Sequence, residues 1–120
     1  MTRTEFEGRV RSPCVYVLAS GLYGTLYVGV TSDIVRRAWE HRTGAIEGFS
    51  RKYGVKRPVY LEFHSGMTEA ITREKQMKKW ERAWKIALIE RENPRWEDLY
   101  HGIVGSEPPM GSRLRGNDER

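Results

Sequence analysis

The segment at residues 25–42, "TLYVGVTSDIVRRAWEHR", decides the fold, because it reads as a β-strand that passes through a short polar turn into an α-helix. The run "TLYVGV" favours a strand, and "TSD" offers candidate N-caps for the helix that follows. Gly44 is a typical C-terminal stop for that helix. An ordinary packing helix requires neither Arg37 nor His41, which lie one turn apart, so this pair is the first candidate for a functional role.

The rest of the chain supplies the elements that surround this segment. The run "CVYVLAS" at 14–20 predicts a strand, and the glycines of "GLYG" join it to the strand at 25–30 as a hairpin. A third strand is expected at 58–64, and one long helix at 68–91, where an Asn-Pro pair ends it. The order β-β-α-β-α predicts an α+β fold, with a small, mostly antiparallel three-stranded sheet flanked by helices.

Apolar spacing predicts which helical faces are buried. The first helix has an apolar stripe made of Ile34, Val35, Ala38 and Trp39. The long helix has a second stripe made of Met77, Trp80, Trp84 and Leu88. Arg37 and His41 lie beside the first stripe, so they could reach over the edge of the sheet.

Length and composition limit the classes of protein that fit. A chain of 120 residues favours one domain, expected at 13–100, with a flexible tail at 1–12 and a disordered one at 101–120. The net charge of +5 is typical of proteins with a polyanionic partner. The lone Cys14 excludes an intramolecular disulfide and a thiolate zinc site. No apolar run approaches the ~20 residues needed to span a bilayer, and the polar N-terminus does not resemble a secretory signal, so we expect no membrane partner and a cytoplasmic location.

Two tyrosines on the predicted hairpin form a second candidate group. Side chains alternate faces along a strand, so Tyr16 points away from Val15 and Val17, and Tyr27 points away from Val28. An even number of loop residues puts both phenols on one side of the sheet, nearly opposite each other. Cross-strand aromatic pairs also stabilise sheets, so the spacing alone leaves packing and catalysis open.

Charged side chains extend the candidate site. Glu74 and Glu81 both lie at the margin of the long helix's stripe, and periodicity does not separate them. The opposite helical face is basic, and the loop at 48–57 interleaves Phe49 and Tyr53 with basic residues. Such surfaces suit a phosphate backbone and bases, although basic runs are also common on solvated faces. The candidate nucleic-acid-binding residues are Arg51, Lys52, Lys56, Arg57, Lys75, Lys78 and Lys79.

The order and spacing of these segments resemble the GIY-YIG endonucleases, in particular their small single-domain members. The matching segments are "CVYVLAS", "LYVGVTSDIVRRAWEHR", the loop "EGF…KYGVKRPVY", "TREKQMKKW" and "WKIALIERENPRWEDL". The similarity as a whole covers residues 13–100. The two signature tripeptides are degenerate. "CVY" stands in place of Gly-Ile-Tyr and "YVG" in place of Tyr-Ile-Gly, while both tyrosines are kept.

The resemblance implies a catalytic site with a divalent metal, Mg²⁺ or Mn²⁺. It places the catalytic arginine at Arg37 rather than Arg36, and the metal-binding glutamate at Glu74 rather than Glu81. The implied catalytic residues are Tyr16, Tyr27, Arg37, His41, Glu74 and Asn93, with Glu74 as the metal ligand.

The activity that the resemblance implies is hydrolysis of DNA phosphodiester bonds, structure-selective or weakly specific, as in DNA repair or recombination. RNA stays open as a substrate, and a partner protein or a homodimer could direct the enzyme to its target. Because both tripeptides are degenerate, a catalytically silent nucleic-acid-binding module is the alternative. A small protein-interaction domain, in which the aromatic residues only form a core, is a further class.

Overall fold

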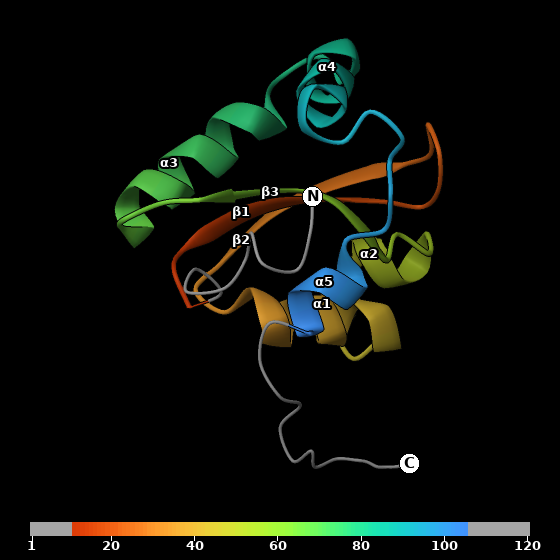
Figure 1. The fold of residues 1–120 in the computed structure, drawn as a ribbon, viewed down its shortest axis with the longest axis horizontal. Helices are drawn as coiled ribbons and strands as arrows, with labels where there is room; N and C mark the ends of the chain where they lie inside the picture. The colour runs from red at the N-terminus through yellow and green to blue at the C-terminus, as the bar shows by residue number, and fades with distance from the viewer. Residues whose placement is uncertain (1–10, 106–120) are drawn as a thin grey trace.

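The computed structural model describes residues 11–105, which fold as a three-stranded antiparallel sheet between two layers of helices (Figure 1). The strands are β1 (Cys14–Ala19), β2 (Leu26–Thr31) and β3 (Arg57–Phe63), in the order β2-β1-β3. The predicted α+β class and all three strands are confirmed, with boundaries within one residue of those expected. The central strand β1 is buried along its whole length, because helices cover both of its faces.

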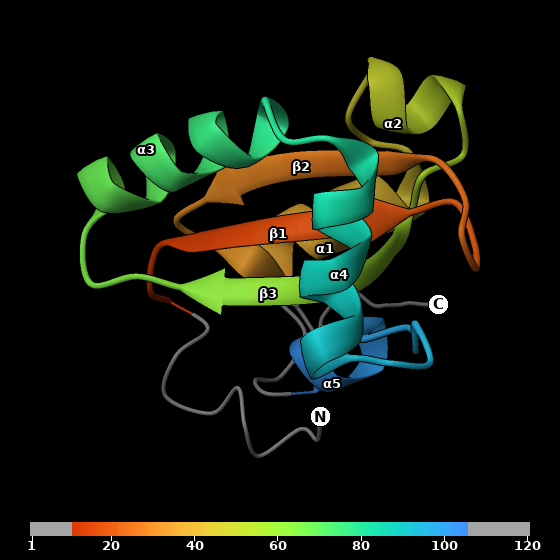
Figure 2. The ribbon, with the colours of Figure 1, turned by 90° about the horizontal axis from the view of Figure 1, so that it is seen from above.

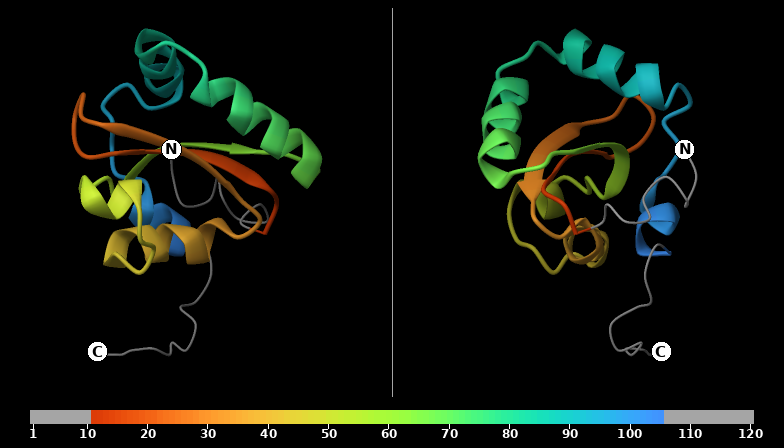
Figure 3. Two further views of the ribbon diagram at one scale, coloured as in Figure 1. Left: turned by 180° about the vertical axis from the view of Figure 1, so that it is seen from behind. Right: turned by 60° about the vertical axis from the view of Figure 1, so that its left-hand side comes forward.

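Helices lie on both sides of the sheet (Figure 3). One layer contains α1 (Ile34–Thr43), α2 (Phe49–Lys52) and α5 (Tyr100–Val104), and the other contains α3 (Met67–Lys78) and α4 (Arg82–Glu92). Alternate residues of β1 supply the two cores. Cys14, Tyr16 and Leu18 face the α1 layer, whereas Val15, Val17 and Ala19 face the α3 layer.

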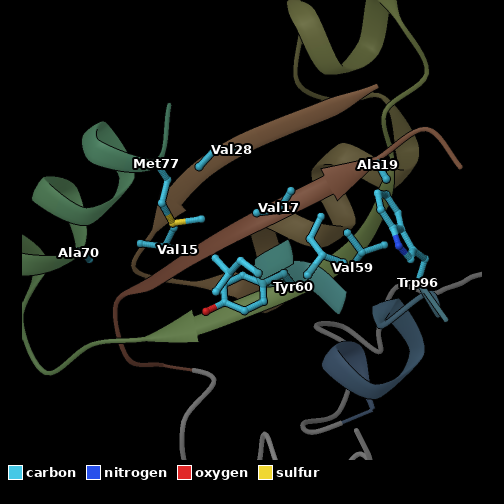
Figure 4. Close-up of a cluster of buried hydrophobic side chains, with 11 residues drawn as sticks. Val15, Val17, Ala19, Val28, Val59, Tyr60, Ala70, Met77 and Trp96 are labelled. Carbon is cyan, nitrogen blue, oxygen red and sulfur yellow. The ribbon is translucent and has the colours of Figure 1, made fainter. Parts of the chain in front are cut away.

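The core beneath α3 and α4 is apolar (Figure 4). Val15 and Val17 pack there with Val28 of β2 and Met77 of α3, and full burial of each such side chain stabilises the fold by about 1.5–3 kcal/mol. A bulge in the pairing of β1 with β3 leaves Val59 as an extra residue.

The prediction of a single helix at 68–91 is wrong, because residues 79–81 are not helical and separate α3 from α4. A straight helix of that length would be about 36 Å long, whereas the break lets α3 follow β2 and α4 cross β1 and β3 (Figure 2). The side chain of Arg82 fixes the start of α4 by donating to the carbonyls of Tyr23 and Gly24 at 2.7 and 2.8 Å. Trp84 is consequently 56% exposed rather than part of a buried stripe. None of the helices in the described part of the chain is long and apolar enough to cross a membrane.

The folded region extends beyond the predicted boundary at residue 100. Residues 100–104 form α5, in which Ile103 is fully buried, so the predicted tail at 101–120 begins too early. Arg42 of α1 ties this segment down through two hydrogen bonds to Asp98, at 2.7 and 2.6 Å. The rest of the predicted tails, at 1–10 and 106–120, lies outside the described residues.

Candidate active site

The two tyrosines of the hairpin lie on the same face of the sheet, as predicted. Tyr16 of β1 pairs with Gly29 of β2, whereas Tyr27 pairs with Leu18, so the tyrosines are diagonal rather than directly opposite neighbours. Their ring centroids are 6.4 Å apart. Both side chains belong to the core beneath α1, where Tyr16 is buried and Tyr27 is half-buried.

Gly29 makes room for the Tyr16 phenol. A Cβ atom on Gly29 would lie 2.4 Å from both Cζ and Oη of Tyr16, which is far inside van der Waals contact. The Tyr16 ring therefore crosses over Gly29 in the middle of β2. This crossing explains why the strand reads Tyr-Val-Gly: any larger residue would displace the phenol.

Helix α1 begins and ends as its sequence predicts. The carboxylate of Asp33 accepts a hydrogen bond from the backbone N–H of Arg36 at 3.1 Å, and Gly44 adopts a left-handed φ of 79° at the C-terminal end. Its buried face differs from the expected one. Trp39 is 51% exposed, and His41 takes the inward position instead.

A chain of hydrogen bonds connects three buried polar side chains. Tyr16 Oη lies 2.9 Å from His41 Nε2, and His41 Nδ1 lies 2.8 Å from Ser50 Oγ. The Tyr27 ring lies against the same imidazole, with centroids 5.5 Å apart. Ser50 belongs to α2 and was not among the predicted site residues, because no spacing rule in the sequence links it to His41.

Burial keeps the Tyr16–His41 pair uncharged at neutral pH. Burial raises the pKa of Tyr16 above its ordinary value, and proximity to Tyr27 raises it further, while the charge of Arg37 and a hydrogen bond from its side chain act in the opposite direction. Burial and the charge of Arg37 lower the pKa of His41 to about 4. The phenol therefore keeps its proton, and the imidazole carries a single N–H.

Arg37, rather than its neighbour Arg36, lies beside this pair. Its charge acts on both Tyr16 and His41. The Arg37 side chain is 40% exposed, and its Nε lies 3.3 Å from a carboxylate oxygen of Glu40. The guanidinium group thus acts on the phenol while its side chain stays accessible to a ligand.

Glu74 comes from the other helical layer. It is buried on α3, and its carboxylate lies 2.6 Å from Nζ of Lys78. No recorded hydrogen bond or ion pair among residues 11–105 joins Glu74 to Tyr16, His41 or Arg37. Glu74 belongs to α3, which runs along β2 (Figure 2), on the opposite side of the sheet from α1 (Figure 1).

Asn93 has a different environment from the one expected of a site residue. Its amide donates to the carbonyls of Val59 and Glu97 at 3.0 and 2.9 Å, and its side-chain oxygen accepts from the N–H of Glu97 at 2.9 Å. These contacts fix the turn after α4 against β3. The amide is therefore engaged in the fold, and the structure does not bring it to the tyrosines.

Aromatic rings extend from Tyr27 to the surface of the loop before β3. Phe49 stacks on Tyr27 with centroids 6.1 Å apart, and Tyr53 lies 4.8 Å beyond Phe49. Phe49 and Tyr53 are 46% and 52% exposed. Of the predicted nucleic-acid-binding residues, Lys52 lies over the Tyr53 ring, with its Nζ 5.4 Å from the centroid, whereas Lys75 and Lys78 belong to α3 in the other layer. Arg51, Lys52, Lys56, Lys75, Lys78 and Lys79 are exposed, and Arg57 is half-buried.

Comparison with known proteins identifies the class of this domain. Residues 12–87 match the family model described as the GIY-YIG catalytic domain. The chain therefore belongs to the GIY-YIG family, and its domain is a GIY-YIG nuclease domain. The predicted resemblance is thereby confirmed.

Its relatives are small proteins with the designation UPF0213. The one from Syntrophus aciditrophicus (strain SB) is 40% identical over 78 residues, which are 58% of this chain and 80% of that protein. The one from Clostridium perfringens is 35% identical over 65 residues, which are 54% and 70% of the two chains. The solution NMR structure of a UPF0213 protein from Bacillus halodurans is 27% identical with a TM-score of 0.47, and the match covers 75% of this chain and 95% of that one.

Proposed function

We propose that the protein is a metal-dependent endonuclease that hydrolyses DNA phosphodiester bonds and selects DNA by structure rather than by sequence. The observation that carries this proposal is the buried Tyr16–His41 hydrogen bond of 2.9 Å beside Arg37. A polar network inside an otherwise apolar layer is costly unless its groups are paired. Networks that shift the pKa values of their members are concentrated at functional sites.

Arg37 is the proposed clamp for the scissile phosphate. A guanidinium group donates two parallel hydrogen bonds to phosphate oxygens, and the 40% exposure of this side chain leaves it available to do so. Because it also lies beside Tyr16, a phosphate bound by Arg37 is brought next to the phenol. A donor aimed at developing charge in this way is typically worth about 10²- to 10³-fold in rate.

Tyr16 is the proposed general base, assisted by His41 and bordered by Tyr27. A neutral phenol accepts the proton of the attacking water only if its own proton leaves, and His41 Nε2 is within hydrogen-bond distance to take it. Since Tyr16 is 1% exposed, the water has to arrive together with the substrate, on the side of Arg37.

The donor set fits a divalent cation that takes most of its ligands from substrate and water. Residues 11–105 contain no cluster of three or more His, Cys, Asp or Glu side chains that could enclose a metal. Mg²⁺ commonly binds through one carboxylate together with phosphate oxygens and waters, and Glu74 supplies such a carboxylate once Lys78 releases it. When bound, Mg²⁺ or Mn²⁺ supplies charge stabilisation at the leaving oxygen. Asn93 has no part in this scheme, because its amide is already paired.

The loop before β3 is the proposed contact with nucleic acid. Phe49 and Tyr53 offer exposed rings for stacking on bases that are accessible at nicks, flaps or junctions, and the basic residues of the loop hold phosphates. Stacking does not read sequence, so we expect selection of DNA structure, as repair or recombination requires. One site cuts one strand, and cutting both strands therefore requires a second copy or a partner protein.

A cleavage assay tests the proposal. Labelled duplex, flap, four-way junction and single-stranded DNA, with matching RNA, are incubated with Mg²⁺, Mn²⁺ or EDTA. We expect metal-dependent cutting of DNA by the parent protein, loss of at least about 10²-fold in Glu74→Ala, and little change in the matched control Glu81→Ala. Glu81 is exposed at the start of α4.

Other results of the assay would identify the alternatives. Salt-sensitive DNA binding without cutting on any substrate would support a catalytically silent binding module. Equal cutting by Glu74→Ala and the parent would remove Glu74 from the site. Absence of both cutting and binding would overturn the nuclease function for this chain.

A further inference from the structure

Ser50 is the one buried residue of α2. Its neighbours Phe49, Arg51 and Lys52 are all exposed, whereas Ser50 is 4% exposed and points its hydroxyl at the imidazole of His41. A serine in a short surface helix is ordinarily solvated, so a buried hydroxyl here needs an explanation.

The backbone around Ser50 holds this hydroxyl in place. The carbonyl of Ser50 accepts a hydrogen bond from the N–H of Val55 at 2.8 Å, and Val55 is fully buried in the same core as Tyr16. At the other end, Lys52 N–H donates to the carbonyl of Gly48 at 2.9 Å. Ser50 is therefore anchored to the core rather than carried on a free loop.

The donors and acceptors of the chain fix the direction of its hydrogen bonds. Arg37 has only donors, so the phenol proton of Tyr16 has His41 Nε2 as its acceptor among the recorded contacts of residues 11–105. If Nε2 carried the imidazole proton, a buried phenol donor would be left unpaired. The single N–H of neutral His41 is therefore on Nδ1, and it donates to Ser50 Oγ.

We propose that Ser50 is a positioning residue, which accepts the Nδ1–H of His41 and so keeps the Nε2 lone pair directed at the Tyr16 phenol. Tyr16 and His41 then form a proton relay that Ser50 holds in position. Its catalytic role rests on the nuclease function proposed above. The hydrogen bond made by one ring nitrogen of a histidine sets the state of the other nitrogen.

The relay passes one proton along, and Tyr16 and His41 return to their starting protonation states at the end of the cycle. As the water attacks the phosphorus atom, the bond from phosphorus to the leaving 3′ oxygen breaks, and that oxygen takes a proton from the solvent. The proton of the attacking water passes to Tyr16 Oη, and the phenol proton passes to His41 Nε2. The resulting imidazolium holds both N–H groups, one donated to Tyr16 and one to Ser50. When the product leaves, His41 returns its proton to Tyr16, which gives one up to the solvent.

The state of the His41 ring is measured by ¹⁵N NMR on the full chain, in the parent, Ser50→Ala, Ser50→Thr and the control Thr72→Ala. Thr72 is an exposed helical residue whose hydroxyl donates to the carbonyl of Thr68. We expect a protonated Nδ1 and an unprotonated Nε2 in the parent, in Ser50→Thr and in the control. Ser50→Ala should give a mixture of the two tautomers.

Cleavage kinetics give the second readout. We expect Ser50→Ala to lower kcat by about 10- to 100-fold, as is usual when the partner that orients a histidine is lost. KM should stay unchanged, because Ser50 does not face the substrate, and Ser50→Thr should restore kcat. If Ser50→Ala fails to fold, Ser50→Cys takes its place, since a thiol has similar shape and accepts hydrogen bonds weakly.

The two readouts separate this inference from the nuclease proposal. A parent protein with its proton on Nε2, or a Ser50→Ala protein with unchanged tautomer and kcat, would overturn the positioning role even if the parent cuts DNA. A parent that does not cut DNA, yet shows a tautomer that depends on Ser50, would overturn the nuclease function and leave the positioning role in place.

Discussion

The two faces of β1 bury very different chemistry within one six-residue strand. On the α3 side, Val15 and Val17 pack in a cluster built almost wholly of apolar side chains (Figure 4). On the α1 side, Tyr16 lies between them in sequence but is hydrogen-bonded to His41, itself bonded to Ser50. A hydrogen-bonded polar chain thus lies within the core on the α1 side, whereas the cluster around Val15 and Val17 is apolar.

The two faces differ in what holds their buried groups in place. Apolar burial stabilises a fold without requiring a specific partner for each atom. Each polar group of the Tyr16–His41–Ser50 chain, by contrast, depends on a particular neighbour, and the loss of any one leaves another buried and unpaired. Perturbing the polar face should therefore disturb specific neighbours, which the following predictions test.

Acid should destabilise the protein through His41, and this is the largest effect we expect. The folded pKa of His41, about 4, lies below its ordinary value of 6.5, so between these two pH values the unfolded chain binds more protons. Stability is fully present above pH 6.5 and falls as the pH drops toward 4, by about 3 kcal/mol in all. Denaturant titrations from pH 7 to 4 measure this loss.

Carboxylates also protonate at the acid end of this range, so a variant has to isolate the histidine. His41→Gln should be less stable at neutral pH and should lack most of the slope between pH 6.5 and 4. The exposed His101 provides the control, since His101→Gln should keep the parental slope. The same slope in all three proteins would contradict a buried neutral imidazole.

Gly29→Ala should cost about 1–3 kcal/mol of unfolding free energy, the usual range for overpacking. The new Cβ would meet the Tyr16 ring at 2.4 Å and force it away from His41. Gly21→Ala is the matched control, because its Cβ would enter open space.

A double variant assigns the cost to this contact. In a background in which Tyr16 is already alanine, Gly29→Ala should cost much less than in the parent, because the clashing ring is gone. Equal costs in the two backgrounds would show that the glycine is needed by the β2 backbone instead. Thermal or chemical denaturation of the four proteins in the cycle provides the comparison.

The parts of the fold that the sequence predicted correctly depend on local pattern. Alternation along β1 and β2 assigned Tyr16 and Tyr27 to one face, and the cap at Asp33 and the stop at Gly44 delimited α1. The choice of Glu74 over Glu81 could not be made from periodicity, since both lie at the margin of the same stripe, and it came only from the family resemblance.

The parts that failed depend on contacts between distant segments. The break between α3 and α4 does not interrupt the apolar spacing, and Arg82 fixes it by bonding a hairpin nearly sixty positions earlier. Trp39 looked more suited to burial than His41, but the partners of His41 come from β1 and α2. Ser50 was missed for the same reason, because the loop geometry that brings it to His41 is not a local pattern.

The smallest effect we expect is the difference in stability, about 1 kcal/mol, between removing the hydroxyl of Tyr16 and removing that of Tyr60, two buried tyrosines on opposite faces of the sheet. Tyr60 on the α3 side donates its hydroxyl to Glu62 at 3.1 Å, and the same carboxylate also accepts from Arg73 at 3.1 and 2.9 Å. Tyr60→Phe therefore removes one of several donors to a half-buried group, at a cost of about 0.5–1.5 kcal/mol.

Tyr16→Phe should cost about 1–3 kcal/mol, because it leaves the Nε2 lone pair of His41 buried without its donor. Equilibrium unfolding of both variants measures the unfolding free energy that each one loses. A larger loss for Tyr60→Phe would contradict the idea that buried groups on the α1 face depend more strongly on single partners. Cleavage extends the test, since Tyr16→Phe should abolish the proposed activity whereas Tyr60→Phe should retain it. Loss of cleavage in Tyr16→Phe but not in Tyr60→Phe, with both proteins folded, would show that the hydroxyl of Tyr16 serves the chemistry in addition to the fold.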